Sequence, residues 1–328
     1  MPVRLLTSLL AVFALLAIAG CGSGGDSEGA APPTTPPPSG KAEDFPTPAA
    51  GETLAELQGD LPQGPILQPS VSLLEKGENR VAFAIYDLAR SQLSGAEVVL
   101  YTARPDGTGV RGPYVARSES LKVESAFASR TTLDDPDSAK SVYIADVPFK
   151  RNGSVSVIAL VRLDRRLMRT DPAVMTVGSK GATPPGPGER AIAIDTDTLA
   201  SAGGDERSID TRLPPAPELH RVNFRDVLGK KPVVLQFATP QLCQSRVCGP
   251  VVDVALQAKA RAGSGVAFVH QEVFRENKVE KGVRPQLAAW KLATEPWTFV
   301  IDRRGVVRSR FEGPMSPGEL ERAVAAVR

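Results

Sequence analysis

The sequence predicts a multidomain protein in which an N-terminal all-β domain is followed by a C-terminal α/β domain. Residues 66–177 consist of short alternating apolar segments without a helical pattern, whereas residues 218–328 alternate between strand and helix patterns. A length of 328 residues leaves room for about two hydrophobic cores. The net charge is only +2 and the basic residues are scattered, so we expect no nucleic-acid partner.

Residues 1–20 have the pattern of an export signal, with Arg4 before an apolar run and small residues at its end. The tetrapeptide Ile18-Ala19-Gly20-Cys21 is similar to the lipobox of bacterial lipoproteins. This resemblance implies cleavage before Cys21 and a thioether-linked lipid on its sulfur. We therefore expect a lipid-anchored protein on the extracytoplasmic face of the bacterial cell membrane, where disulfides persist. The alternative is an ordinary secreted protein in which Cys21 is unused.

Two segments have linker composition. Residues 21–65 begin with Gly, Ser, Pro and Thr and contain few large apolar side chains, which predicts a disordered tether. Residues 178–217 contain two Pro-rich runs and predict a linker between the domains, with residues 191–195 as a short strand or an extended arm.

About seven strands are expected in residues 66–177, separated by turn residues such as Pro105-Asp106-Gly107 and Asn152-Gly153. They cover residues 71–74, 80–88, 96–102, 114–118, 141–147, 154–163 and 173–177. This pattern predicts an antiparallel β-sandwich that resembles the immunoglobulin-like architecture, without the intersheet cysteine pair of antibody domains. Asp134, Asp135 and Asp137 surround a proline, a pattern more typical of a solvated turn than of a cation site.

The C-terminal domain is predicted element by element. Strands are expected at residues 232–238, 266–270, 297–302 and 306–311, and helices at residues 251–260, 285–292 and 317–327. Gly263 ends the first helix, and Arg303-Arg304-Gly305 joins the last two strands as a hairpin. The order predicts a mixed sheet covered by helices on both faces.

Cys243 and Cys248 lie between the first strand and the first helix of this domain, where a helix N-terminus lowers a thiol pKa. Proline is tolerated in the first turn of a helix, so Pro250 indicates a helix that begins near Cys248 or Gly249. Cys243 would then lie in the preceding loop. Because lipidation accounts for Cys21, these two cysteines form the natural pair.

Residues 224–328 resemble the thioredoxin-like superfamily, especially membrane-tethered, extracytoplasmic thiol-disulfide oxidoreductases. The resemblance rests on the strand at residues 233–238, the segment Glu295-Pro296-Trp297-Thr298-Phe299 and the hairpin at residues 299–307. It implies that Cys243 and Cys248 are the redox pair and that Pro296 is the cis-proline beside them. Trp297 would either line the substrate groove or enter the core as an aromatic residue of the strand. No cofactor is expected.

The cysteine spacing departs from the Cys-x-x-Cys of that family, because four residues separate Cys243 from Cys248. Residues five apart on a regular helix point about 140° away from each other, so both cannot lie in the helix and form a disulfide. Cys248-Gly249-Pro250 also resembles the start of the family's Cys-Gly-Pro-Cys, with Val251 in place of its second cysteine. The helix position favours Cys248 as the attacking thiol, and exposure favours Cys243. Both remain candidates.

A bridge that closes so short a loop stabilises a protein by only about 2 kcal/mol, which favours a redox role over a structural one. We therefore predict a lipid-anchored thiol-disulfide oxidoreductase that acts on exported or envelope proteins with cysteines. One alternative is a non-enzymatic cell-envelope binding protein with a static disulfide. Another is a copper carrier that uses Cys243, Cys248 and His270, partly similar to the Sco-type copper chaperones. Those proteins use Cys-x-x-x-Cys and a histidine in a different loop, and a strand-end histidine is more often simply packed. His220 carries no signal.

Overall fold

The computed structural model describes residues 40–243 and 245–328, which belong to one compact unit. The expected export signal, the lipidation of Cys21 and the first part of the tether lie outside the described residues. Among the helices in the described ranges, none has the length and apolar character needed to cross a membrane.

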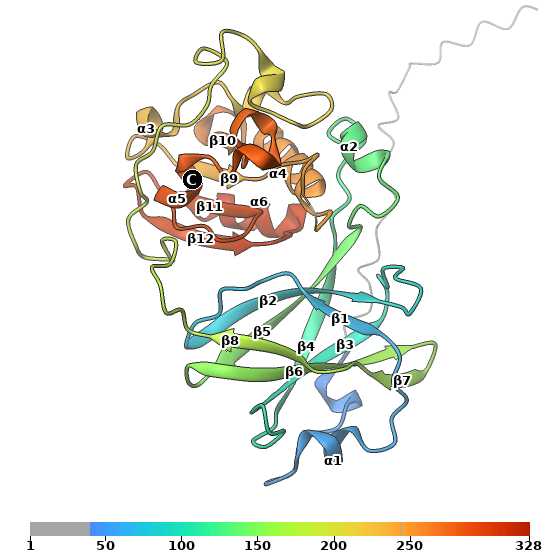
Figure 1. Cartoon of the computed structure of the whole chain (residues 1–328). Coiled ribbons are helices and arrows are strands. Elements are labelled where there is room, and N and C mark those ends of the chain that lie inside the picture. The colour runs from blue at the N-terminus through green and yellow to red at the C-terminus, as the bar shows by residue number, and fades with distance from the viewer. Residues whose placement is uncertain (1–39, 244) are drawn as a thin grey trace, which may run out of the picture. The chain divides into compact units, whose positions relative to one another are not determined.

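The N-terminal part is a single antiparallel sheet that curls on itself (Figure 1). Its order is β1-β2-β5-β4-β3-β6, and both β7 and β8 pair with the free edge of β6. The strands are β1 (Ile66–Pro69), β2 (Gly77–Tyr86), β3 (Glu97–Ala103), β4 (Arg111–Ser120), β5 (Ser141–Phe149), β6 (Gly153–Leu163), β7 (Arg166–Arg169) and β8 (Ala173–Val177). The all-β prediction is confirmed. The strands, however, form one hydrogen-bonded sheet where the sandwich predicted two, because β3 pairs with both β4 and β6 and so joins the two groups of strands.

The alternating apolar residues of these strands explain the core inside the curl. Val81, Phe83 and Ile85 of β2 alternate inward and pack with Tyr143 of β5 and with apolar residues of β3, β6 and β8. Inward residues two positions apart are what one buried face of a pleated strand requires. The phenol oxygen of Tyr143 is satisfied by the N–H of Ala96, so this large side chain is buried without an unpaired hydroxyl.

The predicted strand at residues 71–74 is absent from the sheet. The N–H groups of Ser72 and Leu73 donate to the carboxylate of Glu312 at 2.9 and 2.8 Å, so they are not available for a strand partner. Close by, Gly313 has a φ of 74°, and a Cβ built on it would lie 2.3 Å from the Ser70 carbonyl oxygen. Contacts far apart in the sequence therefore determine this segment.

The segment from residue 40 to residue 61 packs against the outer face of the sheet, although its composition assigns it to the tether. It contains η1 (Ala42–Asp44) and α1 (Leu54–Gln58), and α1 begins with a capping box between Thr53 and Glu56. Phe45, Leu54 and Leu57 are buried against β3 and β6. These apolar side chains bury enough surface to order a short segment that would not fold alone.

The C-terminal part is a four-stranded mixed sheet in the order β10-β9-β11-β12, covered by helices on both faces as the sequence predicts. β9 pairs in parallel with β10 and antiparallel with β11, and β11 pairs antiparallel with β12. The strands are β9 (Val233–Phe237), β10 (Ala267–Gln271), β11 (Trp297–Ile301) and β12 (Val307–Glu312). The helices are α3 (Phe224–Val227), α4 (Cys248–Ala262), α5 (Pro285–Ala289) and α6 (Pro317–Ala325).

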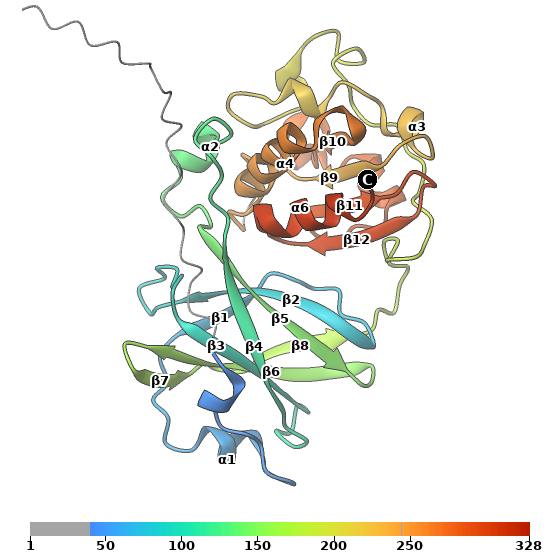
Figure 2. The same cartoon turned by 180° about the vertical axis from the view of Figure 1, so that it is seen from behind.

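Local sequence explains where these helices begin and end. α4 ends at Gly263, whose φ of 66° suits glycine, and α6 begins with a capping box between Ser316 and Glu319. α4 and α6 lie side by side on one face of the sheet (Figure 2), and their apolar residues pack on Val234 and Val300. The opposite face is covered by α3, α5 and the buried side chain of Trp290.

The segment between the two sheets is not a free linker. Arg190 forms a bridge with Val306, and Ala191 donates its N–H to the Gly305 carbonyl, so the segment extends the α/β region. The remaining short helices are η2 (Glu206–Ser208), η3 (Pro217–Leu219), η4 (Gly263–Gly265), η5 (Arg275–Asn277) and η6 (Val279–Lys281).

Candidate functional site

Cys243 and Cys248 lie at the junction between β9 and α4. β9 is a fully buried inner strand of the sheet, and the chain leaves it through a loop that contains Cys243 before α4 begins at Cys248. The prediction that the helix starts near Cys248 and leaves Cys243 in the loop is confirmed. Cys243 is 8% exposed and Cys248 is 0% exposed, and the two are near each other without a disulfide.

Hydrogen bonds favour the ionised form of Cys243. Its sulfur accepts hydrogen bonds from the Cys248 thiol, the Ser245 hydroxyl and the backbone N–H groups of Val247 and Cys248. The Ser245 Oγ lies 3.1 Å from the sulfur. α4 has no side-chain cap from Val247, so its first N–H groups can face the sulfur. The hydrogen bond with Cys248 contributes most, and together these contacts lower the pKa of Cys243 to about 6 in spite of its burial.

The environment of Cys248 has the opposite effect. Complete burial raises the pKa of Cys248 well above its ordinary value of 9.0, and the neighbouring Cys243 sulfur raises it further. The backbone N–H of Thr239 acts against this rise without cancelling it. The pair therefore has an outer thiolate and an inner thiol at neutral pH. Of the two attacking thiols that the sequence left open, Cys243 has both the lower pKa and the greater exposure.

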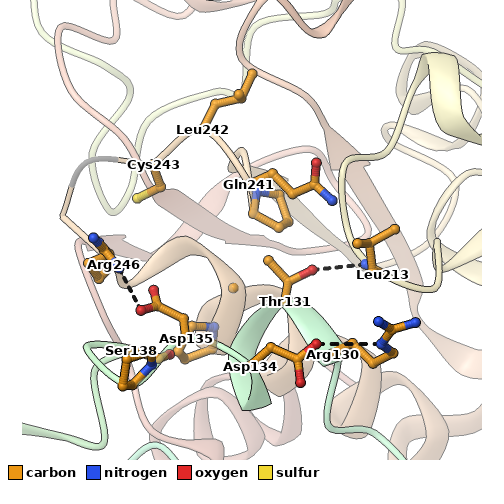
Figure 3. A pocket seen from close by; sticks show the side chains of 14 residues that line it. Arg130, Thr131, Asp134, Asp135, Ser138, Leu213, Gln241, Leu242, Cys243 and Arg246 are labelled. Carbon is orange, nitrogen blue, oxygen red and sulfur yellow. Dashed lines mark hydrogen bonds and ion pairs between the residues drawn. The ribbon is translucent and has the colours of Figure 1, made fainter.

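Cys243 lines an open hollow of about 860 Å³, to which we refer as the Cys243 hollow (Figure 3). One wall is the cysteine loop with the start of α4, and the other is the loop between β4 and β5, which contains α2 (Arg130–Leu133). The Nη1 of Arg246 pairs with the Oδ1 of Asp135 across the hollow at 2.5 Å. The lining combines charged and polar side chains with apolar ones such as Leu213 and Leu242.

Asp253 of α4 ties the second wall of the hollow in place. Its carboxylate is 1% exposed and accepts hydrogen bonds from the Arg212 Nε at 2.9 Å and the Thr132 Oγ1 at 2.7 Å. The N–H and hydroxyl of Ser129 also donate to it, each at 3.0 Å. A Cβ on Gly249 would lie 3.0 Å from the Thr132 Oγ1, so α4 and α2 approach closely there. Asp253 thus joins α4 to the loop between β4 and β5.

Pro296 and Trp297 occupy different environments. The Glu295–Pro296 peptide bond is cis and Pro296 is buried. Trp297 is buried on the core side, stacks on Phe299 with ring centroids 5.8 Å apart, and donates its Nε1–H to the Thr294 hydroxyl. Trp297 is not among the described residues that line the Cys243 hollow. Its surroundings are those of a core residue.

Sequence reasoning missed two carboxyl groups with raised pKa values, Glu295 near the cysteines and Glu272 just after β10. Burial raises the pKa of Glu295, and the nearby Cys243 raises it further. Burial also raises the pKa of Glu272, at the end of β10, to about 7, although the N–H and hydroxyl of Thr211 donate to it at 2.8 and 2.6 Å. Nothing local distinguishes these residues from surface glutamates, because only tertiary contacts bury them.

Both ring nitrogens of His270 contact groups other than the two cysteines. Its Nε2 donates to the Ala238 carbonyl oxygen at 3.0 Å, and its Nδ1 faces the His220 Nε2 at 3.3 Å. Within the described residues, the one group of three close metal-ligand side chains comprises Asp210, His220 and His270, without either cysteine. The structure therefore gives His270 and the apparently uninformative His220 a shared environment.

No protein-family model matches the chain, and no curated protein is similar to it in sequence. Among solved structures, the thiol:disulfide interchange protein of the thioredoxin family from Chlorobium tepidum TLS is similar, with 17% sequence identity and a TM-score of 0.30. The similarity covers 45% of this chain and 99% of that chain. The resemblance to that structure is distant.

Proposed function

We propose that this protein is a thiol-disulfide oxidoreductase that acts on exported or envelope proteins through Cys243 and Cys248. The observation that carries the proposal is the opposite perturbation of the two thiols. The pKa of Cys243 is lowered to about 6 in a hollow open to solvent, and that of the completely buried Cys248 is raised. A static disulfide needs no such asymmetry, whereas a reaction with an attacking and a resolving thiol does.

In the proposed reaction, the Cys243 thiolate attacks one sulfur of a substrate disulfide. The substrate S–S bond breaks, a mixed disulfide with Cys243 forms, and the other substrate sulfur leaves as a thiolate and takes up a proton. Cys248 then loses its proton and attacks the Cys243 sulfur, which releases the second substrate thiolate and forms the Cys243–Cys248 disulfide. Two electrons pass from the protein to the substrate, and the reverse sequence oxidises a substrate dithiol.

The same contacts explain why Cys248 reacts second. Contact with Cys243 raises the pKa of Cys248, through both a hydrogen bond and charge. Conversion of Cys243 into a mixed disulfide removes that negative charge, so the Cys248 proton becomes easier to lose. Glu295 interacts electrostatically with both sulfurs, and its raised pKa makes it the group we propose to accept this proton.

The location of the reaction is also a proposal. The lipobox-like sequence before Cys21 supports cleavage and lipidation at that residue, which would hold the protein on the extracytoplasmic face of the cell membrane. The Cys243 hollow would receive an extended cysteine-containing segment of a substrate. Its opposed charges, Arg246 and Asp135, would have to be separated or bridged by that segment.

Trapping tests the proposal directly. The Cys248→Ser variant should accumulate a mixed disulfide between Cys243 and exported proteins, because the resolving thiol is missing. The matched Cys243→Ser variant should trap little, since the remaining thiol is buried and has a raised pKa. Adducts are separated without reductant and identified by mass spectrometry. If neither variant forms an adduct, and if the wild-type protein does not reduce a disulfide-bonded peptide, the proposal is wrong.

A further inference from the structure

Three buried side chains with metal-binding atoms converge beneath the sheet edge formed by β10. Asp210 and His220 come from the segment before α3, and His270 comes from β10. One ligand atom of each lies within 4.8 Å of the others, and the residues are 2%, 1% and 0% exposed. The His270 Nδ1 lies 3.3 Å from the His220 Nε2. The two oxygens of Asp210 lie 3.5 Å from the His220 Nε2 and 3.8 Å from the His270 Nδ1.

These separations are those of long hydrogen bonds, and they also fit donors around a shared ion. Good hydrogen bonds to nitrogen have lengths of about 2.7–3.2 Å, and all three separations are longer. If each ligand atom lay about 2.1 Å from one central ion, these separations would correspond to ligand–ion–ligand angles of about 104°, 113° and 130°. Such angles are compatible with a distorted tetrahedral site in which both carboxylate oxygens are ligands.

The surrounding hydrogen bonds orient His270 and Asp210 for this role. The Nε2–H of His270 donates to the Ala238 carbonyl, so the lone pair of the imidazole is on the Nδ1 that faces the group. The two Asp210 oxygens accept hydrogen bonds from the backbone N–H groups of Arg212 and Ala216 at 2.9 and 2.7 Å.

The charge of Asp210 provides a second, independent argument. Its side chain is fully buried, and no Lys or Arg of the described residues forms a salt bridge with it. Arg212, which follows closely in the sequence, directs its guanidinium to Asp253 instead. A carboxylate in such surroundings costs free energy unless a cation compensates it.

We propose that Asp210, His220 and His270 form a closed structural site for a divalent transition-metal ion, of which Zn²⁺ is the first choice for nitrogen and carboxylate ligands. The ion would fasten the segment that precedes α3 to β10. It would also lie close to Ala238, from which the chain continues into the cysteine loop. The site is independent of the proposed disulfide exchange, and its full burial means that the ion enters as the protein folds.

The test uses the full-length chain with Cys21→Ser, Cys243→Ser and Cys248→Ser, so that thiolates cannot bind the metal. The protein is unfolded in denaturant in the presence of a chelator, which removes any bound metal. It is then refolded with Zn²⁺, with Co²⁺ or without metal. We expect about one retained Zn²⁺ per chain after desalting, a higher Tm than in the metal-free protein, and the visible absorption of four-coordinate Co²⁺. Failure to retain Zn²⁺, or an unchanged Tm, would overturn the proposal.

Variants assign the ligands. Asp210→Asn and His220→Gln should each lower the affinity for Zn²⁺ at least about a hundredfold, because each removes a direct ligand. Glu272→Gln, a buried carboxyl outside the group, should retain the metal. Metal binding that persists in both ligand variants, or that is lost in Glu272→Gln, contradicts the assignment. Asp210→Asn is chosen because asparagine has nearly the same shape as aspartate and should disturb the packing little. Circular dichroism of each metal-free variant checks its fold.

Discussion

The Cys248→Ala substitution should raise the pKa of Cys243. The hydrogen bond with the Cys248 thiol is the largest contribution to the lowered pKa of Cys243, and alanine cannot provide it. The Ser245 hydroxyl and the backbone N–H groups at the start of α4 remain, so the pKa should rise only part of the way from about 6 toward the ordinary 9.0. We expect a rise of at least about one unit.

The size of the effect decides which quantity to measure. At pH 7 a thiol with a pKa of about 6 is about 0.9 ionised, and one with a pKa of 9.0 is about 0.01 ionised. A thiolate also becomes less nucleophilic as its pKa falls, by about 16- to 30-fold over three units. The two effects leave a net difference in rate of only about three- to sixfold at pH 7. The midpoint of the pH–rate profile is therefore more informative than the rate at one pH.

The assay is alkylation of the reduced protein by iodoacetamide from about pH 4 to about pH 10, in a Cys21→Ser background. Mass spectrometry identifies Cys243 as the modified residue. Cys248→Ser is the matched control, because its hydroxyl retains a hydrogen-bond donor beside Cys243, and its midpoint should lie below that of Cys248→Ala. The reasoning fails if the wild-type midpoint is near 9, or if Cys248→Ala and the wild type share one midpoint.

Three further substitutions test the contacts around the site. Asp253→Ala should lower the free energy of unfolding in urea by about 3–5 kcal/mol, because it leaves Arg212 buried without its partner. The pKa of Glu272 is about 7 in the folded protein, whereas its ordinary value, taken for the unfolded chain, is 4.5. Its contribution to stability is therefore present below pH 4.5 and is lost as the pH rises to 7. Glu272→Gln should remove this loss of about 3 kcal/mol, as measured by urea unfolding at both ends of that range. Gly313→Ala should lower the Tm and reduce the free energy of unfolding by more than about 2 kcal/mol, because the new Cβ would collide with the Ser70 carbonyl oxygen.

Matched controls separate these effects from general damage. Asp195→Ala breaks an exposed ion pair with Arg225 and should leave stability almost unchanged. Gly263→Ala places a Cβ at a similar positive φ with nothing within 4 Å, so it should be milder than Gly313→Ala. If each control is as harmful as its partner, or if Glu272→Gln keeps the wild-type pH dependence, the corresponding structural reason is wrong.

The local parts of the fold were predictable because their signals are local. The four C-terminal strands and the cysteine loop follow from apolar runs separated by Gly and Pro, and the helix that begins at Cys248 follows from Pro250. The strand predicted at residues 71–74 was wrong because Glu312, 240 residues from Ser72, takes its N–H groups. The single curled sheet was likewise missed, because alternation identifies strands and not their partners.

The sequence by itself determined that two cysteines would stand between a buried strand and a helix, one in the loop and one at the helix start. It did not determine their chemistry, because a thiol pKa depends on burial and on hydrogen bonds from residues brought near by folding. Only the tertiary structure decided that Cys248 is completely buried, that Cys243 faces the hollow, and that the two histidines meet Asp210. The physical reason is that spacing fixes distances along the chain, whereas pKa values and ligand sets depend on distances through space.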